Sequence, residues 1–341
     1  MIGRRATPRR GASSWLIAPL VAVVLASGCA ANSDSGANPA PVTATTVVTP
    51  QATSIRASGG TWVTVAMGQL DQPLNTFWQL FYRPTGSTRW SNQVEATAVA
   101  TNGGIALAPA GGNTVMVGVV PTDLLTFTPI IASGDGGRSW QDGLIDAGLA
   151  KTPDSLASDG AGRTLALTGD NTSGKVLLSA HDLSIWQTVI AEAQLAATPA
   201  GRRCGLTALT AVTYAGTTPV VAGNCSNPGV SGVFALRSGS WQAAGPPTAP
   251  TSPVQVLGLR TNAGVTTGLF ATSSAADAGH LTAAWTIDGG QHWTESPSLP
   301  LAGSQRITSF GPADGSGVFV LIANPDGINR VIDSPSISRA V

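Results

Sequence analysis

The sequence predicts an all-β protein built from many short strands, and three observations support this prediction. The chain of 341 residues contains 41 glycines and 23 prolines, which is above average usage but below that of disordered low-complexity chains. Its residues are 43% hydrophobic but only 11% charged, whereas a helical bundle would be rich in Leu, Glu, Lys and Arg. Tryptophans also recur about every fifty residues, which indicates a repeated structural unit.

Residues 1–28 resemble a secretory signal peptide. They contain four arginines and no acidic residue, followed by an apolar run from Trp15 to Ala26. That run is too short to span a bilayer, which takes about 20 residues. The paired Arg9 and Arg10 leave twin-arginine export open as an alternative route.

The segment from Leu25 to Cys29 (LASGC) resembles a bacterial lipobox, with Ala26 in the place usually taken by leucine. The resemblance implies a lipoprotein whose Cys29 carries acyl chains such as palmitate. We therefore expect an exported protein anchored by lipid to the outer face of the bacterial cell membrane. The alternative is an ordinary signal peptide followed by an incidental cysteine.

Residues 29–52 predict a flexible tether between the lipid and a folded domain. The segment is rich in Ala, Thr, Pro, Ser and Asn and has too few large hydrophobic residues to fold alone. The full chain has a net charge of zero, and removal of residues 1–28 would leave a net charge of −4. A mildly acidic chain does not favour nucleic-acid binding.

The other two cysteines, Cys204 and Cys225, flank a predicted hairpin. Two apolar runs, Leu206–Tyr214 and Pro219–Gly223, are separated by the turn-like sequence AGTT. The ends of a hairpin meet in space, and export implies an oxidising compartment. We therefore predict a structural disulfide between Cys204 and Cys225; a redox or metal pair is the alternative.

Five tryptophans form a ladder along the chain, with spacings of 50, 46, 55 and 52 residues. Each follows a turn-like stretch that itself follows a short apolar or alternating run. The five are Trp90, Trp140, Trp186, Trp241 and Trp293.

The clearest of these turns are two octapeptides, residues 133–140 (SGDGGRSW) and 286–293 (TIDGGQHW). Both place Ser or Thr, Asp, Gly and Trp at positions 1, 3, 5 and 8. The eight matching residues are Ser133, Asp135, Gly137, Trp140, Thr286, Asp288, Gly290 and Trp293. An aspartate can accept hydrogen bonds from the amides of its own turn, a glycine can adopt positive φ, and a tryptophan can pack between sheets.

These octapeptides resemble the Asp box, or BNR repeat, of sialidase-type β-propellers. The resemblance implies that each box lies between the third and fourth strands of a blade and has a structural role. The turns before Trp90, Trp186 and Trp241 are degenerate, and His181 stands where the third box would have its aspartate.

The fold class that follows is all-β, a single β-propeller of about six four-stranded blades spanning residues 53–341. Residues 190–198 could form one or two helical turns. The predicted blades cover approximately residues 53–91, 92–143, 144–192, 200–245, 253–297 and 304–341. The last has no closing tryptophan; Ile337 or an N-terminal strand is expected to complete it.

The sequence assigns no catalytic residue. Sialidases use an arginine triad, a Tyr/Glu nucleophile pair and an acidic residue, but this chain has two tyrosines and three glutamates. The segment Phe81–Pro84 matches the family's Phe/Tyr-Arg-Ile-Pro tetrapeptide only loosely. The three histidines have no metal-ligand spacing, so we expect neither a metal nor a cofactor.

We therefore expect a non-catalytic binding or scaffold module for a protein or glycan, monomeric and not bound to nucleic acid. Candidate contact residues are arginines near strand starts, namely Arg56, Arg163, Arg260 and Arg306. Two alternative functions remain: a glycoside hydrolase of sialidase-like fold, and an assembly factor for a membrane complex.

Overall fold

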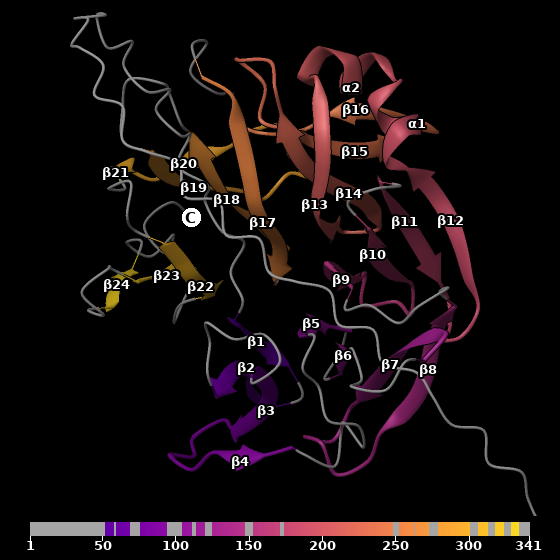
Figure 1. Cartoon of the computed structure of the whole chain (residues 1–341), viewed down its shortest axis with the longest axis vertical. Coiled ribbons are helices and arrows are strands. Elements are labelled where there is room, and N and C mark those ends of the chain that lie inside the picture. The colour runs from indigo at the N-terminus through magenta and orange to yellow at the C-terminus, as the bar shows by residue number, and fades with distance from the viewer. Residues whose placement is uncertain are drawn as a thin grey trace, which may run out of the picture. The chain divides into compact units, whose positions relative to one another are not determined.

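The computed structural model (Figure 1) describes most of the chain from residue 52 onward. The described ranges are residues 52–57, 59–68, 76–93, 104–110, 114–119, 125–146, 153–170, 174–247, 252–262, 264–272, 279–300, 306–312, 318–323 and 329–333. Only the backbone is described from residue 306 onward. The predicted signal segment, Cys29 and the tether up to residue 51 lie outside these ranges.

The described residues form five antiparallel four-stranded blades in chain order. Blade one comprises β1 (Ala52–Ala57), β2 (Gly60–Gly68), β3 (Thr76–Pro84) and β4 (Ser91–Asn92). Blade two comprises β5 (Ile105–Pro109), β6 (Val115–Val119), β7 (Phe127–Ser133) and β8 (Gln141–Asp146). Blade three comprises β9 (Ser155–Ser158), β10 (Thr164–Asp170), β11 (Gly174–Ala180) and β12 (Trp186–Ala191).

Blade four comprises β13 (Leu206–Ala215), β14 (Thr218–Cys225), β15 (Val233–Arg237) and β16 (Ser240–Ala243). Blade five comprises β17 (Val254–Asn262), β18 (Val265–Thr272), β19 (His280–Thr286) and β20 (Thr294–Glu295), with β21 (Leu299–Pro300) also paired to β19. Each blade is a meander, because every strand pairs with the next one along the chain.

The strands follow from their side-chain pattern. β6, with the sequence VMVGV, is buried along its whole length, as expected for a strand covered on both faces. β7 carries Ile130 and Ile131 on opposite faces, and each side chain enters a different apolar cluster. A middle strand of a blade therefore contributes to the cores on both of its sides.

Four apolar clusters lie at the four seams between successive blades. The seam between blades one and two, for example, holds Trp62 and Leu80 from one side and Leu107 and Val117 from the other. The first strands of successive blades also lie next to one another, from β1 through β5, β9 and β13 to β17. Sheets packed face to face around their first strands form a β-propeller, which confirms the predicted fold class.

The described residues contain five complete four-stranded blades, near the predicted count of about six. The remaining strands, β22 (Arg306–Pro312), β23 (Val318–Ala323) and β24 (Asn329–Asp333), form a three-stranded antiparallel set in the described residues. β22 pairs in parallel with β1, Ala52 opposite Ser309 and Thr53 opposite Phe310. The N-terminal strand β1 therefore joins the sheet of this last set, as one of the two alternatives anticipated, and Ile337 lies outside the described residues.

Two short helices connect blades three and four. α1 spans Glu192–Ala196 and α2 spans Pro199–Cys204, so helix extends beyond the predicted residues 190–198. The Thr198 hydroxyl accepts a hydrogen bond from the Gly201 amide, Pro199 occupies the first helical turn, and Gly205 ends α2 with φ of 61°. These are ordinary start and stop signals.

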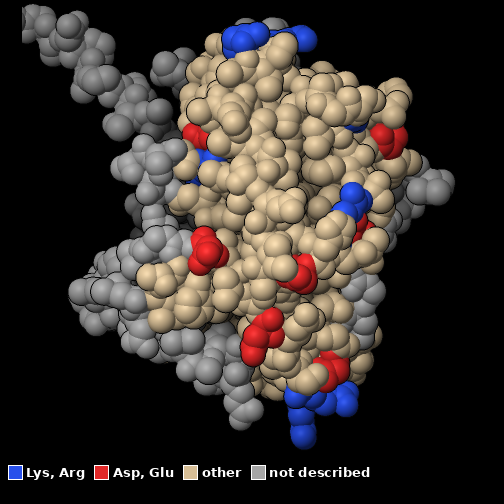
Figure 2. Space-filling view, turned by 90° about the vertical axis from the view of Figure 1, so that its right-hand side faces the viewer, with Lys and Arg blue, Asp and Glu red and all other residues tan. Residues whose placement is uncertain are grey.

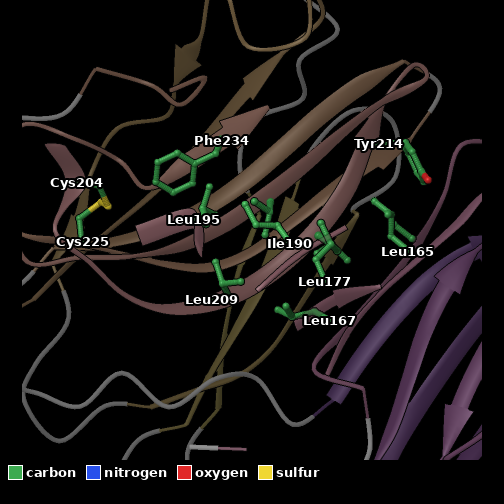
Figure 3. Packing of buried hydrophobic residues seen from close by; sticks show 13 residues of the cluster. Leu165, Leu167, Leu177, Ile190, Leu195, Cys204, Leu209, Tyr214, Cys225 and Phe234 are labelled. Carbon is green, nitrogen blue, oxygen red and sulfur yellow. A yellow bond between two sulfur atoms is a disulfide. The ribbon is translucent and has the colours of Figure 1, made fainter. Parts of the chain in front are cut away.

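The predicted disulfide joins Cys204 at the end of α2 to Cys225 at the end of β14. Leu206 and Cys225 are opposite each other in the β13–β14 hairpin, which brings the end of α2 to the end of β14. Figure 3 shows the disulfide at one end of the apolar cluster between blades three and four and Tyr214 at the other. Both cysteines are buried, so the disulfide is part of the core between blades three and four.

Candidate functional site

The turn from Ser133 to Trp140 is organised around the carboxylate of Asp135. Its Oδ1 accepts hydrogen bonds from the amides of Arg138 and Ser139, both at 3.0 Å, and from the Ser133 hydroxyl at 2.9 Å. The Ser139 hydroxyl donates to Oδ2 at 2.6 Å. The Ser133 oxygen in turn accepts from the Gly137 amide at 2.9 Å, so the turn satisfies its own donors.

The turn from Thr286 to Trp293 repeats this arrangement. Asp288 Oδ1 accepts from the Thr286 hydroxyl at 2.7 Å and from the amides of Gln291 and His292 at 2.9 and 3.0 Å. His292 Nδ1 lies 2.6 Å from Asp288 Oδ2. The equivalent oxygen of the first turn, Asp135 Oδ2, accepts a hydrogen bond from the Ser139 hydroxyl. Both turns connect the third and fourth strands of their blades.

These hydrogen bonds favour the ionised carboxylates. Bonds from the side chain and amide of Ser139 lower the pKa of Asp135 from 3.8 to about 2. The His292 amide, followed by the Thr286 and His292 side chains, holds the pKa of Asp288 still further below its usual range. A carboxylate with such a low pKa is a poor general acid near neutral pH, which favours a structural role.

The lowered pKa of Asp135 predicts that its contribution to stability is lost in acid. Because the pKa of Asp135 is lower in the folded protein than in the unfolded chain, the ionised carboxylate stabilises the fold at pH values above 3.8. This contribution to the free energy of unfolding is lost as the pH falls through about 2. Asp135→Asn should therefore lower the Tm at pH 6, and its difference from the unmodified protein should shrink steadily between pH 4 and pH 2. A difference in Tm that stays constant over this range would contradict the assignment.

The degenerate third turn uses a displaced aspartate. Asp182 Oδ1 accepts from the amides of Ser184 at 2.7 Å and Ile185 at 2.8 Å, and these bonds lower its pKa. Sequence reasoning placed His181 at the aspartate position and overlooked its neighbour. An aspartate two residues before a serine is a common Asx-turn signal that would have identified it.

A further aspartate turn between β9 and β10 was not predicted. Asp159 Oδ1 accepts from the amides of Ala161 and Arg163 at 2.8 and 3.0 Å, and Arg163 Nε donates to Oδ2 at 2.6 Å. Burial acts to raise the pKa of Asp159, but the Arg163 side chain and the turn amides outweigh it and lower the pKa. Arg163 also donates to the Thr217 carbonyl at 3.0 Å and so links blades three and four.

Tyr214 packs beside this ion pair. The Arg163 guanidinium lies 5.6 Å from its ring centre, and burial raises the pKa of Tyr214 to about 12. A nucleophilic tyrosine needs a neighbouring base or a lowered pKa. Tyr214 therefore acts as a packing residue at this seam.

Four ladder tryptophans pack at the seams, each against the cluster shared with the preceding blade. Trp140 lies edge-on to Trp62 with ring centres 5.7 Å apart, and Trp293 Nε1 donates to the Ala244 carbonyl at 2.8 Å. Trp186 and Trp241 are partly buried against the two intervening clusters. These four residues have equivalent surroundings, as expected of a repeated blade.

Trp90 differs from the other four. Its side chain is 45% exposed, and the Arg83 guanidinium stacks over its ring at 4.9 Å from the centre. It belongs to none of the apolar clusters of the described residues. The ladder therefore leaves one large aromatic surface open to solvent.

The glycine at position five of each octapeptide allows its turn to approach the preceding blade. Gly137 and Gly290 have φ of 84° and 90°. A Cβ on Gly290 would lie 2.3 Å from the Ala244 carbonyl oxygen, and one on Gly137 would lie 2.3 Å from the Gln93 side chain. Only glycine satisfies both the backbone conformation and the contact.

The four candidate arginines do not share one end of the blades. Arg56 lies near the end of β1, whereas Arg306 begins β22, and the two strands are parallel. Arg260 lies near the end of β17, and burial lowers its pKa to about 10. Arg163 follows the first strand β9 and is paired with Asp159. Of the four, only Arg306 lies at the start of its strand.

Within the described ranges, no group of three or more His, Cys, Asp or Glu side chains is placed to hold a metal ion. No helix in that part of the chain is both long and apolar enough to cross a bilayer.

No protein-family model matches this sequence, and a search of curated proteins returns no match. Solved structures do match its fold. A protein of unknown function from Dyadobacter fermentans has a TM-score of 0.51 at 13% identity, covering 84% of this chain and 93% of its own. An ulvan lyase bound to a GlcA–Rha3S saccharide also has a TM-score of 0.51, at 11% identity, covering 84% and 79%.

The six-bladed fucose-binding lectin of Aleuria aurantia has a TM-score of 0.45 at 15% identity, covering 83% of this chain and 90% of its own. Sialidases are also among the structures that this chain resembles. The fold of this chain is thus similar to those of the Dyadobacter protein and the ulvan lyase. At these identities the likeness concerns the fold alone.

Proposed function

We propose that the protein is a lipid-anchored, extracytoplasmic β-propeller that binds a glycan without cleaving it. Its two octapeptide turns act as Asp boxes, which fix the outer strands of the blades to their neighbours. An ulvan lyase of similar fold, which is bound to a GlcA–Rha3S saccharide, gives a precedent for saccharide binding by this architecture.

The observation that carries this proposal is that the aspartates with shifted pKa values accept hydrogen bonds within their own turns and so have structural roles. Asp135, Asp159, Asp182 and Asp288 all accept hydrogen bonds from their own turns and have lowered pKa values. Tyr214 is buried with a raised pKa. These groups build a rigid scaffold, and the exposed aromatic and polar groups of its turns are left for binding.

The binding function is tested with the full-length protein, solubilised from membranes in detergent, on an array of bacterial, plant and algal glycans. We expect concentration-dependent retention of at least one glycan class. Fluorogenic glycosides incubated with the same preparation should remain uncleaved. Retention of no glycan would overturn the proposed function, and turnover would replace it with a glycosidase.

The anchor is tested by replacing Cys29. Cys29→Ser should abolish incorporation of an alkyne-labelled fatty acid and shift essentially all of the protein out of the membrane pellet after alkaline washing, because two or three acyl chains anchor stably. Ser27→Ala, which keeps a small residue before the cysteine, is the matched control and should remain labelled. Membrane-bound, labelled Cys29→Ser protein would refute lipidation at this residue.

A further inference from the structure

One surface of the molecule combines an exposed indole with two arginines. We call it the Trp90 patch, and it comprises Arg83, Arg89 and Trp90. Arg89 is exposed, and Arg83 is partly exposed over the Trp90 ring. Arg83 belongs to β3, and Arg89 and Trp90 belong to the β3–β4 turn of blade one.

The Trp90 patch lies on the face of blade one that points away from blade two. Tyr82 contacts Trp62 and lies against the turn of Gly136, so its side chain points toward blade two. Side chains alternate along a strand, which places Arg83 on the opposite face of β3. Because the Arg83 guanidinium stacks on the Trp90 ring, the indole lies on that face as well.

The positive charge of the patch has no local counter-charge. Within the described part of the chain, neither guanidinium group is paired with a carboxylate. Figure 2 shows one face of the molecule that is mostly uncharged, with basic side chains at its upper and lower ends and separate acidic and basic side chains between them. Grouped like charges of this kind attract an anionic ligand.

The indole is held in a fixed position. The Thr85 amide donates to the Gly59 carbonyl at 2.9 Å, the Ser87 amide to the Pro84 carbonyl at 3.0 Å, and the Arg89 amide to the Ser87 hydroxyl at 3.0 Å. Arg83 stacks on one face of the Trp90 ring. A rigid turn with a stacked cation presents the rest of the indole to a ligand at low entropic cost.

We propose that the Trp90 patch binds an acidic polysaccharide, with the apolar face of a sugar ring on Trp90 and sugar carboxylates paired to the arginines. This inference rests on the proposed glycan-binding function and names its site and ligand class. Guanidinium groups bind carboxylates through charge-assisted, often bidentate hydrogen bonds. On the same face of blade one, the Asn92 side-chain amide donates to the Gln79 side-chain oxygen at 3.0 Å, and both groups can meet sugar hydroxyls.

An acidic peptide is the less favoured occupant. A peptide that adds to a sheet needs an exposed strand edge of useful length, but the outer strand β4 is only two residues long. The surface instead offers an aromatic plane, planar amides and fixed cations. This combination suits a ring-shaped ligand that carries both hydroxyl and carboxylate groups.

The test measures binding of polygalacturonate to the full-length protein in detergent, with methyl-esterified polygalacturonate as the uncharged form of the same polymer. Polygalacturonate should bind and the esterified polymer should bind at least tenfold more weakly. Trp90→Ala and Arg89→Gln should each weaken binding of polygalacturonate by about tenfold. Arg203→Gln, which removes an exposed arginine on α2, should bind as the unmodified protein does.

The outcomes separate this inference from the proposed function. Binding of polygalacturonate that is unchanged in both variants would overturn the site and leave the function standing. Retention of neutral glycans only would overturn the ligand class, and retention of no glycan would overturn site and function together. Tighter, Trp90-dependent binding of polyglutamate or of phosphatidylglycerol vesicles would replace the saccharide with a peptide or lipid. Equal Tm values for the variants guard against misfolding, because Trp90 and Arg89 are both exposed.

Discussion

Trp62→Ala is expected to lower the free energy of unfolding by about 3–5 kcal/mol, the usual loss for a large aromatic residue removed from a core. Trp62 is fully buried at the seam between blades one and two. Its ring lies 4.5 Å from that of Tyr82 and 5.7 Å from that of Trp140, centre to centre. Its Nε1 donates to the Ala57 carbonyl at 3.0 Å. The substitution would leave a cavity lined by both blades and an unpaired carbonyl.

Urea unfolding followed by circular dichroism measures this loss. Trp90→Ala is the matched control, because it makes the same substitution at an exposed indole and should change stability by about 1 kcal/mol or less. Similar losses for the two variants would show that Trp62 and Trp90 have equivalent surroundings, contrary to the packing described above.

Loss of the disulfide between Cys204 and Cys225 is expected to cost about 3 kcal/mol, because the bond spans a loop of 21 residues. Both cysteines belong to the cluster between blades three and four, together with Leu195 and Phe234. The reduced thiols are small enough to stay in the same core, so the fold should persist. The double variant Cys204→Ala/Cys225→Ala and the reduced unmodified protein should have similar urea midpoints.

The internal control for this prediction is a reductant. Dithiothreitol should lower the midpoint of the unmodified protein and leave that of the double variant unchanged. An unmodified protein that is insensitive to reductant under conditions that expose all thiols would argue against a stabilising bond.

The middle strands of the blades are predictable from sequence. β18, β19 and β23 carry alternating or continuous apolar residues and bulky side chains. Some first strands are less distinct. β9 has the sequence SLAS, and such small residues show no clear alternation of apolar and polar side chains. Small side chains fit this position because β9 lies next to the first strands β5 and β13.

The candidate site was predictable only in part. The spacing of Ser133, Asp135 and Trp140 identified a turn that the hydrogen bonds then explained, because all of its interactions are local in sequence. Asp159 and Asp182 also accept hydrogen bonds from the amides of their own turns, but their sequence spacing differs from that of the octapeptides. The octapeptide pattern therefore did not identify them. The exposure of Trp90 depends on how its blade meets its neighbours, which no local pattern records.

The most direct test measures whether the protein retains an acidic glycan and whether the chain length of that glycan changes. The full-length protein is incubated with polygalacturonate, the complex is isolated, and the chain length of the bound polymer is measured by size-exclusion chromatography. We predict that the polymer is retained at its original length and released by high salt, which screens the arginine contacts. Shortened polymer, or none retained at any ionic strength, would contradict a β-propeller that binds acidic glycans without cleaving them.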